Sequence, residues 1–391
     1  MYKLHNMRGT MPRVLFPCLA LGASFLAACT PTTIPTSLES PGIFPASARH
    51  EKMSNAESAL RNVLKAAGQE PEAKLLRVGH VLGAYREYAM VVDKDGAQKH
   101  TGNVDGPAQD MVPLLERAFQ SFELNSVELD VHVAPPNMTH LNPEEIVVVH
   151  NSPDWREFDR PSAGMDYLKR NTFRTVLDAF LAKGYGKEGG KLYIEVKAPP
   201  VCELSSTTMP SECSRIGRAI AKTIMTTKAE MRPSLAFISF WPKMLEAVHT
   251  GLVALGADAD VHEYVLILGP SSAFWAHVGS GAKGNVPQFD DERKVWLEKT
   301  PWVDAVWASP SPRISPKLGE DMANINRERL AHCATCLNVG VSVYQSNPDA
   351  FEEHLRTAWS ATDVELPACG RGGKKAPAII ESLIYDIDTD N

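Results

Sequence analysis

The chain has 391 residues and a formal net charge of −7 at pH 7, with 40 Lys and Arg against 47 Asp and Glu. Residues 74–391 suffice for one large α/β domain or two small ones. The acidic balance and the lack of a basic tract argue against nucleic acid as a partner.

Residues 1–28 have the pattern of a targeting signal. Lys3, Arg8 and Arg13 form a positively charged start, and the apolar run of about 15 residues that follows is too short to span a bilayer as a helix. The run ends in Leu-Ala-Ala-Cys at Cys29, which resembles the bacterial lipobox, whose cysteine is acylated. The resemblance implies a lipoprotein signal peptide and a lipid anchor that holds the protein on a membrane of the cell envelope, at the outer membrane where the host has one. An ordinary secretory signal with a chance cysteine is the alternative.

Residues 29–73 are expected to form a flexible tether with one short helix. The stretch "TPTTIPTSLESPGIFPASARH" is rich in Thr, Ser and Pro and cannot build a core. The segment "NAESALRNVLKAAG" has a helical pattern, with Asn55 as its expected N-cap. No later apolar stretch reaches the ~18 residues that a membrane span needs.

Short apolar strands alternate with helical stretches through residues 74–391. The predicted strands are 74–81, 126–133, 145–151, 191–198, 234–240, 263–270, 303–309, 340–346 and 381–388. The predicted helices between them include 111–122, 173–186, 214–227, 242–252, 325–340 and 349–361. This alternation is typical of βαβ units and a parallel sheet, and about eight strand–helix pairs predict a (β/α)8 TIM barrel with insertions. A doubly wound open sheet is the alternative.

Two cysteines bracket a short loop and suggest a disulfide. Cys202 and Cys213 stand at the ends of "CELSSTTMPSEC", and an exported chain can keep such a bridge. The two cysteines of the "CATC" stretch at 333–336 allow three interpretations, namely a disulfide bridge, a redox-active pair or a chance spacing. His332 precedes that pair, so the order differs from the haem-attachment motif.

Two of the predicted strands carry acidic side chains on one face. In "SVELDVHV" (126–133) Glu128 and Asp130 alternate with apolar residues, and in "KLYIEVKA" (191–198) Glu195 and Lys197 do the same. Barrel strands pack one face against helices and point the other inward, so the acids are expected inside the barrel. Buried acids are costly unless they meet a cation or reach the active-site mouth.

Three carboxylates that converge from two strands predict a site for one hard divalent cation, Mg²⁺ or Ca²⁺. Lys197 would point toward the same mouth and contact a phosphate oxygen. His80 ends the first strand and His150 ends the apolar run "IVVV". Two imidazoles beside a cation can serve as a base and an acid near neutral pH.

The stretches "RVGH", "VELDVHV", "IVVVHNSPDW" and "LYIEVK" resemble, in this order, the motifs of the glycerophosphodiester phosphodiesterase family. The resemblance implies a metal-dependent phosphodiesterase on a (β/α)8 barrel. By position, Glu128, Asp130 and Glu195 match the metal ligands, His80 and His150 match the acid/base pair, and Lys197 matches the phosphate-contacting lysine. The expected substrate is a small phosphodiester or a phospholipid head group.

Val81 and Leu82 stand where the family usually has Arg-Gly, and "GHVLGA" is more similar to the related phospholipase D toxins, the sphingomyelinase D group. Two alternatives therefore stay open. One is a phospholipase D-like enzyme that cleaves lysophospholipids or sphingolipids and forms a cyclic phosphate. The other is a non-catalytic lipoprotein that binds a polar head group.

Overall fold

The computed structural model describes fourteen stretches of the chain, all within one compact unit, Ile43–Asn391. They are residues 46–66, 75–80, 90–92, 98–100, 111–121, 124–149, 155, 163–203, 208–268, 291–308, 318–332, 337–342, 348–359 and 380–386. The predicted signal peptide, the lipid anchor at Cys29 and the "CATC" stretch lie outside these residues. Among the described helices, none has the length and apolar character to cross a bilayer.

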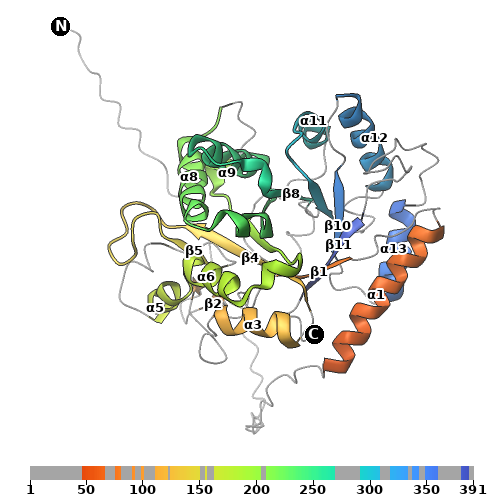
Figure 1. Cartoon of the computed structure of the whole chain (residues 1–391), viewed down its shortest axis with the longest axis horizontal. Coiled ribbons are helices and arrows are strands. Elements are labelled where there is room, and N and C mark those ends of the chain that lie inside the picture. The colour runs from red at the N-terminus through yellow and green to blue at the C-terminus, as the bar shows by residue number, and fades with distance from the viewer. Residues whose placement is uncertain are drawn as a thin grey trace, which may run out of the picture. The chain divides into compact units, whose positions relative to one another are not determined.

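Eight parallel strands close into a barrel, as the sequence predicts (Figure 1). They are β1 (Leu76–His80), β4 (Ser126–Val133), β6 (Leu192–Val196), β7 (Leu235–Ser239), β8 (Glu263–Leu268), β9 (Ala305–Ala308), β10 (Asn338–Ser342) and β11 (Ile380–Asp386). Each strand pairs with the next one along the chain, and β1 also pairs with β11. This closure distinguishes the barrel from a doubly wound sheet, which has open edges.

The predicted strand at 145–151 exists but does not belong to the barrel. It is β5 (Ile146–Val148), and it pairs in antiparallel fashion with the last three residues of β4. Antiparallel strands can follow each other through a short connection, whereas parallel strands need a long crossover. The twelve residues between β4 and β5, 134–145, contain no helix, so the chain returns beside β4. A second antiparallel pair, β2 (Met90–Val92) with β3 (Gln98–His100), lies in the insert after β1.

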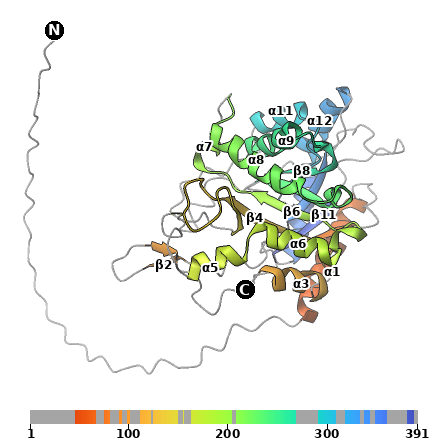
Figure 2. The ribbon, with the colours of Figure 1, turned by 60° about the vertical axis from the view of Figure 1, so that its left-hand side comes forward.

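The helices surround the barrel (Figure 2). They are α1 (Ala46–Ala66), α3 (Met111–Ser121), α5 (Ala163–Arg170), α6 (Phe173–Lys183), α7 (Pro200–Glu203), α8 (Ser211–Met225), α9 (Pro242–Ala254), α11 (Asp291–Lys299), α12 (Leu318–Ala331) and α13 (Pro348–Trp359). The ends of α6 are marked in the sequence. Thr172 caps it by accepting a hydrogen bond from the Thr175 N–H, and Gly184 ends it with φ of 72°.

The alternation of side chains in each strand separates two cores. The outward residues of β4 and β6, such as Leu129 and Ile194, join the large core between the barrel and its helices. The inward residues form a separate core within the barrel. Its buried members are Val78, Tyr193, Ala236, Ile238, Val265, Ala305, Trp307 and Ile384. Polar residues on the inward face of a strand therefore lie in a mostly apolar environment.

The helix expected within the tether belongs to the barrel unit instead. α1 begins at Ala46, so Asn55 lies inside it and is not its N-cap. α1 packs along α13 (Figure 1), and its buried side chains, Leu60 and Val63 among them, join the large core. The compact unit thus starts before residue 74, at Ile43, because the apolar face of α1 is buried against the barrel helices.

The contact between α8 and α9 depends on small residues. The two helices lie side by side in both views (Figures 1 and 2). A Cβ added to Gly217 of α8 would stand 2.2 Å from the carbonyl oxygen of Ala247 of α9. This distance leaves no room for a methyl group unless the helices separate.

We expect Gly217→Ala to destabilise the protein by about 1–3 kcal/mol through overpacking. Helix propensity alone predicts the opposite sign, a gain of about 1 kcal/mol. Urea unfolding of the variant, with the exposed neighbour Arg218→Ala as control, measures the difference. A Gly217→Ala variant as stable as the unmodified protein would contradict the close packing.

Candidate metal centre

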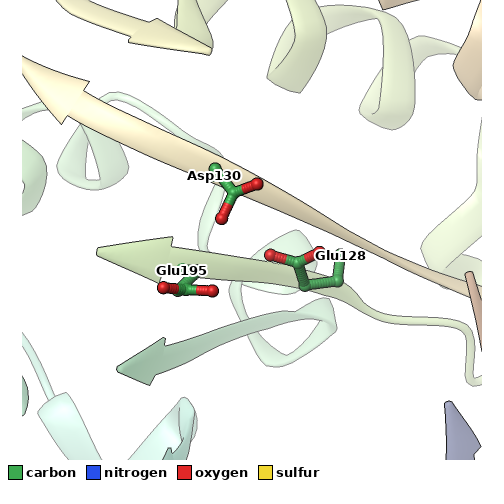
Figure 3. Close-up of side chains that lie close together, drawn as sticks. All are labelled: Glu128, Asp130 and Glu195. Carbon is green, nitrogen blue, oxygen red and sulfur yellow. The ribbon is translucent and has the colours of Figure 1, made fainter. Parts of the chain in front are cut away.

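Three buried carboxylates meet inside the barrel. Asp130 of β4 and Glu195 of β6 stand opposite each other in the register of the two parallel strands. Glu128 precedes Asp130 by two residues and lies on the same face of β4. Their exposed fractions are 0% for Glu128, 1% for Asp130 and 2% for Glu195. One ligand oxygen from each lies within 4.8 Å of the other two. Figure 3 shows the three side chains gathered on the neighbouring strands. The structure thus brings together the three acids that the sequence singles out.

The position of the acids follows from the strand pattern. The residues that alternate with them, among them Val127, Leu129 and Val196, are buried in the outer core. That burial fixes which face of β4 and β6 points inward. Glu195 is the last inward residue of β6, so the cluster lies toward the carboxyl ends of the strands. In TIM-barrel enzymes this end carries the active site.

Lys197 follows β6 and contacts two of the acids. Its Nζ lies 2.6 Å from Asp130 Oδ1 and 2.6 Å from Glu195 Oε1. Its backbone N–H donates to the carbonyl of Val131 and continues the pairing with β4. Asp130, Glu195 and Glu128 together raise the pKa of Lys197 although burial opposes the charge. The lysine is therefore an ammonium ion held at the acid cluster.

One carboxylate of the cluster is poised to exchange a proton near neutral pH. Burial raises the pKa of Glu195 to about 8, and the charge of Asp130 adds to this rise. The ammonium of Lys197 acts in the opposite direction but offsets only part of it. A second cation at the cluster would favour the ionised form of Glu195.

The donor set fits a hard divalent cation. Carboxylate oxygens are the ligands that Mg²⁺ and Ca²⁺ prefer, and none of the three ligand groups is the soft thiolate that Zn²⁺ or Cu⁺ favours. A divalent cation would also stabilise the ionised form of three carboxylates that stand close together in a buried place. Glu128, Asp130 and Glu195 can therefore hold a metal ion.

The structure places the two predicted histidines only in part. His80 is the last residue of β1, and its register partner on the neighbouring strand β11 is Asp386. The other neighbour of β1 is β4, which pairs with β1 through the two residues that precede Glu128. The side chain of His80 and the whole of His150 lie outside the described residues. The chain reaches Val149, whose N–H donates to the carbonyl of Asp130. His80 thus belongs to a strand that pairs with β4, and His150 directly follows a residue that is hydrogen-bonded to β4.

A disulfide joins Cys202 of α7 to Cys213 of α8, which is the pairing that the sequence suggests. α7 begins three residues after Lys197. The bridge ties the segment that follows the lysine to a helix of the barrel shell. His132, the third polar residue on the acid face of β4, is half-buried and is not one of the three clustered ligands.

Two polar arrangements in the barrel are not predicted from the sequence. Ser239, which ends β7, donates to the carbonyl of Val196 and accepts from the N–H of Trp241, so it fixes the chain next to Lys197. Glu263 is the first residue of β8 and lies at the end of the barrel opposite the acid cluster. There it forms an ion pair with Lys191 and accepts a hydrogen bond from the Tyr193 hydroxyl. In both cases the sequence signal is a polar residue at one terminus of an apolar strand, the last residue of β7 and the first residue of β8.

Comparison with models of known protein families and with curated protein sequences gives no match. The likeness to the glycerophosphodiester phosphodiesterase motifs therefore stays a resemblance of four short stretches.

Proposed function

We propose that the protein is a metal-dependent phosphodiester hydrolase that acts on glycerophosphodiesters or related phospholipid head groups. The observation that carries the proposal is the buried cluster of Glu128, Asp130 and Glu195 with the ammonium of Lys197 at its side. This arrangement provides oxygen ligands for a cation and a fixed positive charge for a phosphoryl oxygen. It stands toward the end of the barrel where active sites of this fold lie.

Each residue has a separate task in the proposed reaction. Glu128, Asp130 and Glu195 hold one Mg²⁺ or Ca²⁺, which neutralises charge on the phosphoryl group when it is bound. Lys197, fixed by its two carboxylate contacts, binds a second phosphoryl oxygen. His80 and His150 act as the base that activates the nucleophile and the acid that protonates the departing alcohol. Positioning and charge stabilisation supply most of the rate.

The proposed setting is the cell envelope, with the barrel anchored through acylated Cys29. Stable anchoring takes more than one acyl chain, and the lipobox-like ending of the signal supports this form of attachment. An anchored enzyme would meet phospholipid head groups at the membrane surface. No nucleic acid is proposed as a partner, because the chain is acidic.

We expect a chelator to abolish hydrolysis of glycerophosphodiesters and added Mg²⁺ or Ca²⁺ to restore it. A screen of glycerophosphodiesters and lysophospholipids with each metal identifies the substrate class. Phosphorus NMR of the product then separates hydrolysis from the phospholipase D-like alternative, since only the latter gives a cyclic phosphate. Undiminished turnover after chelation contradicts the proposal, and binding of head groups without turnover supports the non-catalytic alternative.

A further inference from the structure

Trp307 of β9 is a buried polar side chain whose hydrogen-bonding group has no partner among the described residues. Only 2% of the residue is exposed, and it belongs to the core inside the barrel. Its indole Nε1 is buried without a hydrogen-bond acceptor in reach in that part of the chain. A buried N–H without an acceptor costs about 1–3 kcal/mol, so an acceptor that arrives with a ligand is a natural explanation.

The strand registers show which inward residue faces Trp307 across the barrel. In one direction, four steps from strand to strand lead from Trp307 to β4. The first step reaches Ile267, the residue paired with Trp307 on β8. When the registers of the next strand pairs are extended by one or two residues, the following steps reach Phe240, Lys197 and His132. In the other direction, three steps lead from Trp307 through Gly340 and Ser382 to Leu76. The fourth step continues the register of β1 with β4 backward to Leu124, two residues before β4 begins.

The two endpoints, His132 on β4 and Leu124 two residues before its start, differ because the strands are tilted to the barrel axis. The residue midway between them, Glu128, is therefore level with Trp307 and stands on the opposite wall. Inward side chains of a TIM barrel are arranged in such layers of four from alternate strands. Trp307 thus shares a layer with one of the three acids.

A ring contact supports this placement. The centroids of the Trp307 and Tyr193 rings are 4.6 Å apart. Tyr193 is the register partner of Glu128 and precedes Glu195 by two residues on β6. The indole therefore extends from β9 across the interior to the strand that carries Glu195, one layer below that acid. By strand register, the layer of Trp307 is therefore the floor of the site, directly below the layer of Glu195.

We propose that Trp307 is a positioning residue of the metal centre, and that its indole N–H donates to an oxygen in the coordination shell of the bound cation. That oxygen is the carboxylate of Glu128 or a water molecule at the floor of the site. The inference rests on the cation site of the proposed function but is independent of the reaction catalysed there. Groups that orient metal ligands in this way contribute to affinity, and their loss costs roughly tenfold or more.

The test is a two-dimensional proton–nitrogen NMR spectrum of the indole groups. The chain has 7 tryptophans, and the signal of Trp307 is the one missing from the spectrum of Trp307→Phe. We expect saturating Mg²⁺ or Ca²⁺ to shift this signal downfield as the hydrogen bond forms. Trp302→Phe is the matched control, because Trp302 stacks on His249 outside the barrel interior and its replacement leaves the Trp307 shift intact.

Calorimetric titration gives the second readout. Trp307→Phe is expected to weaken cation binding roughly tenfold, and Trp302→Phe to leave it unchanged. If the cation binds with unchanged affinity in Trp307→Phe and the indole signal does not move, this inference is wrong while the metal site stands. If neither metal binds to the unmodified protein, the metal site and this inference both fail.

Discussion

Asp130→Ala is expected to abolish cation binding and to reduce the proposed phosphodiester hydrolysis by at least about a thousandfold. Asp130 is the central member of the cluster, because it is paired with Glu195 across the two strands and also contacts the ammonium of Lys197. Its removal takes away one of the three proposed cation ligands and one of the two carboxylate contacts of Lys197. Calorimetry with Mg²⁺ and Ca²⁺, together with steady-state kinetics on a glycerophosphodiester, measures both losses.

The barrel itself offers a matched control for this experiment. Glu263 is also a buried acid on the inward side of a strand, and it also pairs with a lysine, Lys191, but it lies at the other end of the barrel. Glu263→Gln is expected to lower stability by about 1–3 kcal/mol and to retain cation binding and turnover. Equal losses of turnover in the two variants would mean that Asp130 acts through the fold alone, which contradicts its role as a ligand.

The closed barrel and the acid cluster were predictable from the sequence because they depend on a pattern with a period of two residues. Apolar residues such as Leu129 and Ile194 alternate with acids on both strands, and that alternation fixes which face is inside. The pairing of Asp130 with Glu195 then follows from the parallel order of β4 and β6. Local pattern and global topology give the same answer at these positions.

Other features depend on contacts that no local pattern encodes. β5 has the apolar character of a barrel strand, and only the short connection from β4 makes it antiparallel. α1 was expected in the tether because its sequence neighbours are rich in Pro and Ser, but its buried face packs on a helix some 300 residues later in the chain, α13 (Pro348–Trp359). The finding that Trp307 and Glu128 lie at the same height in the barrel depends on the registers of all eight strands, which a local sequence pattern does not give.

The metal-free protein is expected to lose stability as the pH rises from about 5 to 8. Burial raises the pKa of Glu195 to about 8 in the folded protein, above its ordinary value of 4.5. Below pH 4.5 the carboxyl group is protonated in both the folded and the unfolded chain. Between pH 4.5 and 8 the unfolded chain gives up this proton and the folded chain keeps it, so the unfolded state is increasingly favoured.

Cation binding should depend on pH in the opposite sense. A metal ion needs the ionised carboxylate, so its binding below pH 8 releases the proton of Glu195, and affinity for Mg²⁺ or Ca²⁺ is expected to rise by up to about tenfold per pH unit before it levels off near pH 8. Chelated and metal-saturated samples, unfolded in urea at several pH values, should therefore diverge in stability as the pH increases. Glu195→Gln carries no titrating group at this position, and the pH dependence of the chelated protein should become flatter in that variant. An unchanged slope in Glu195→Gln would assign the titration to another group and remove Glu195 as the proton carrier of the site.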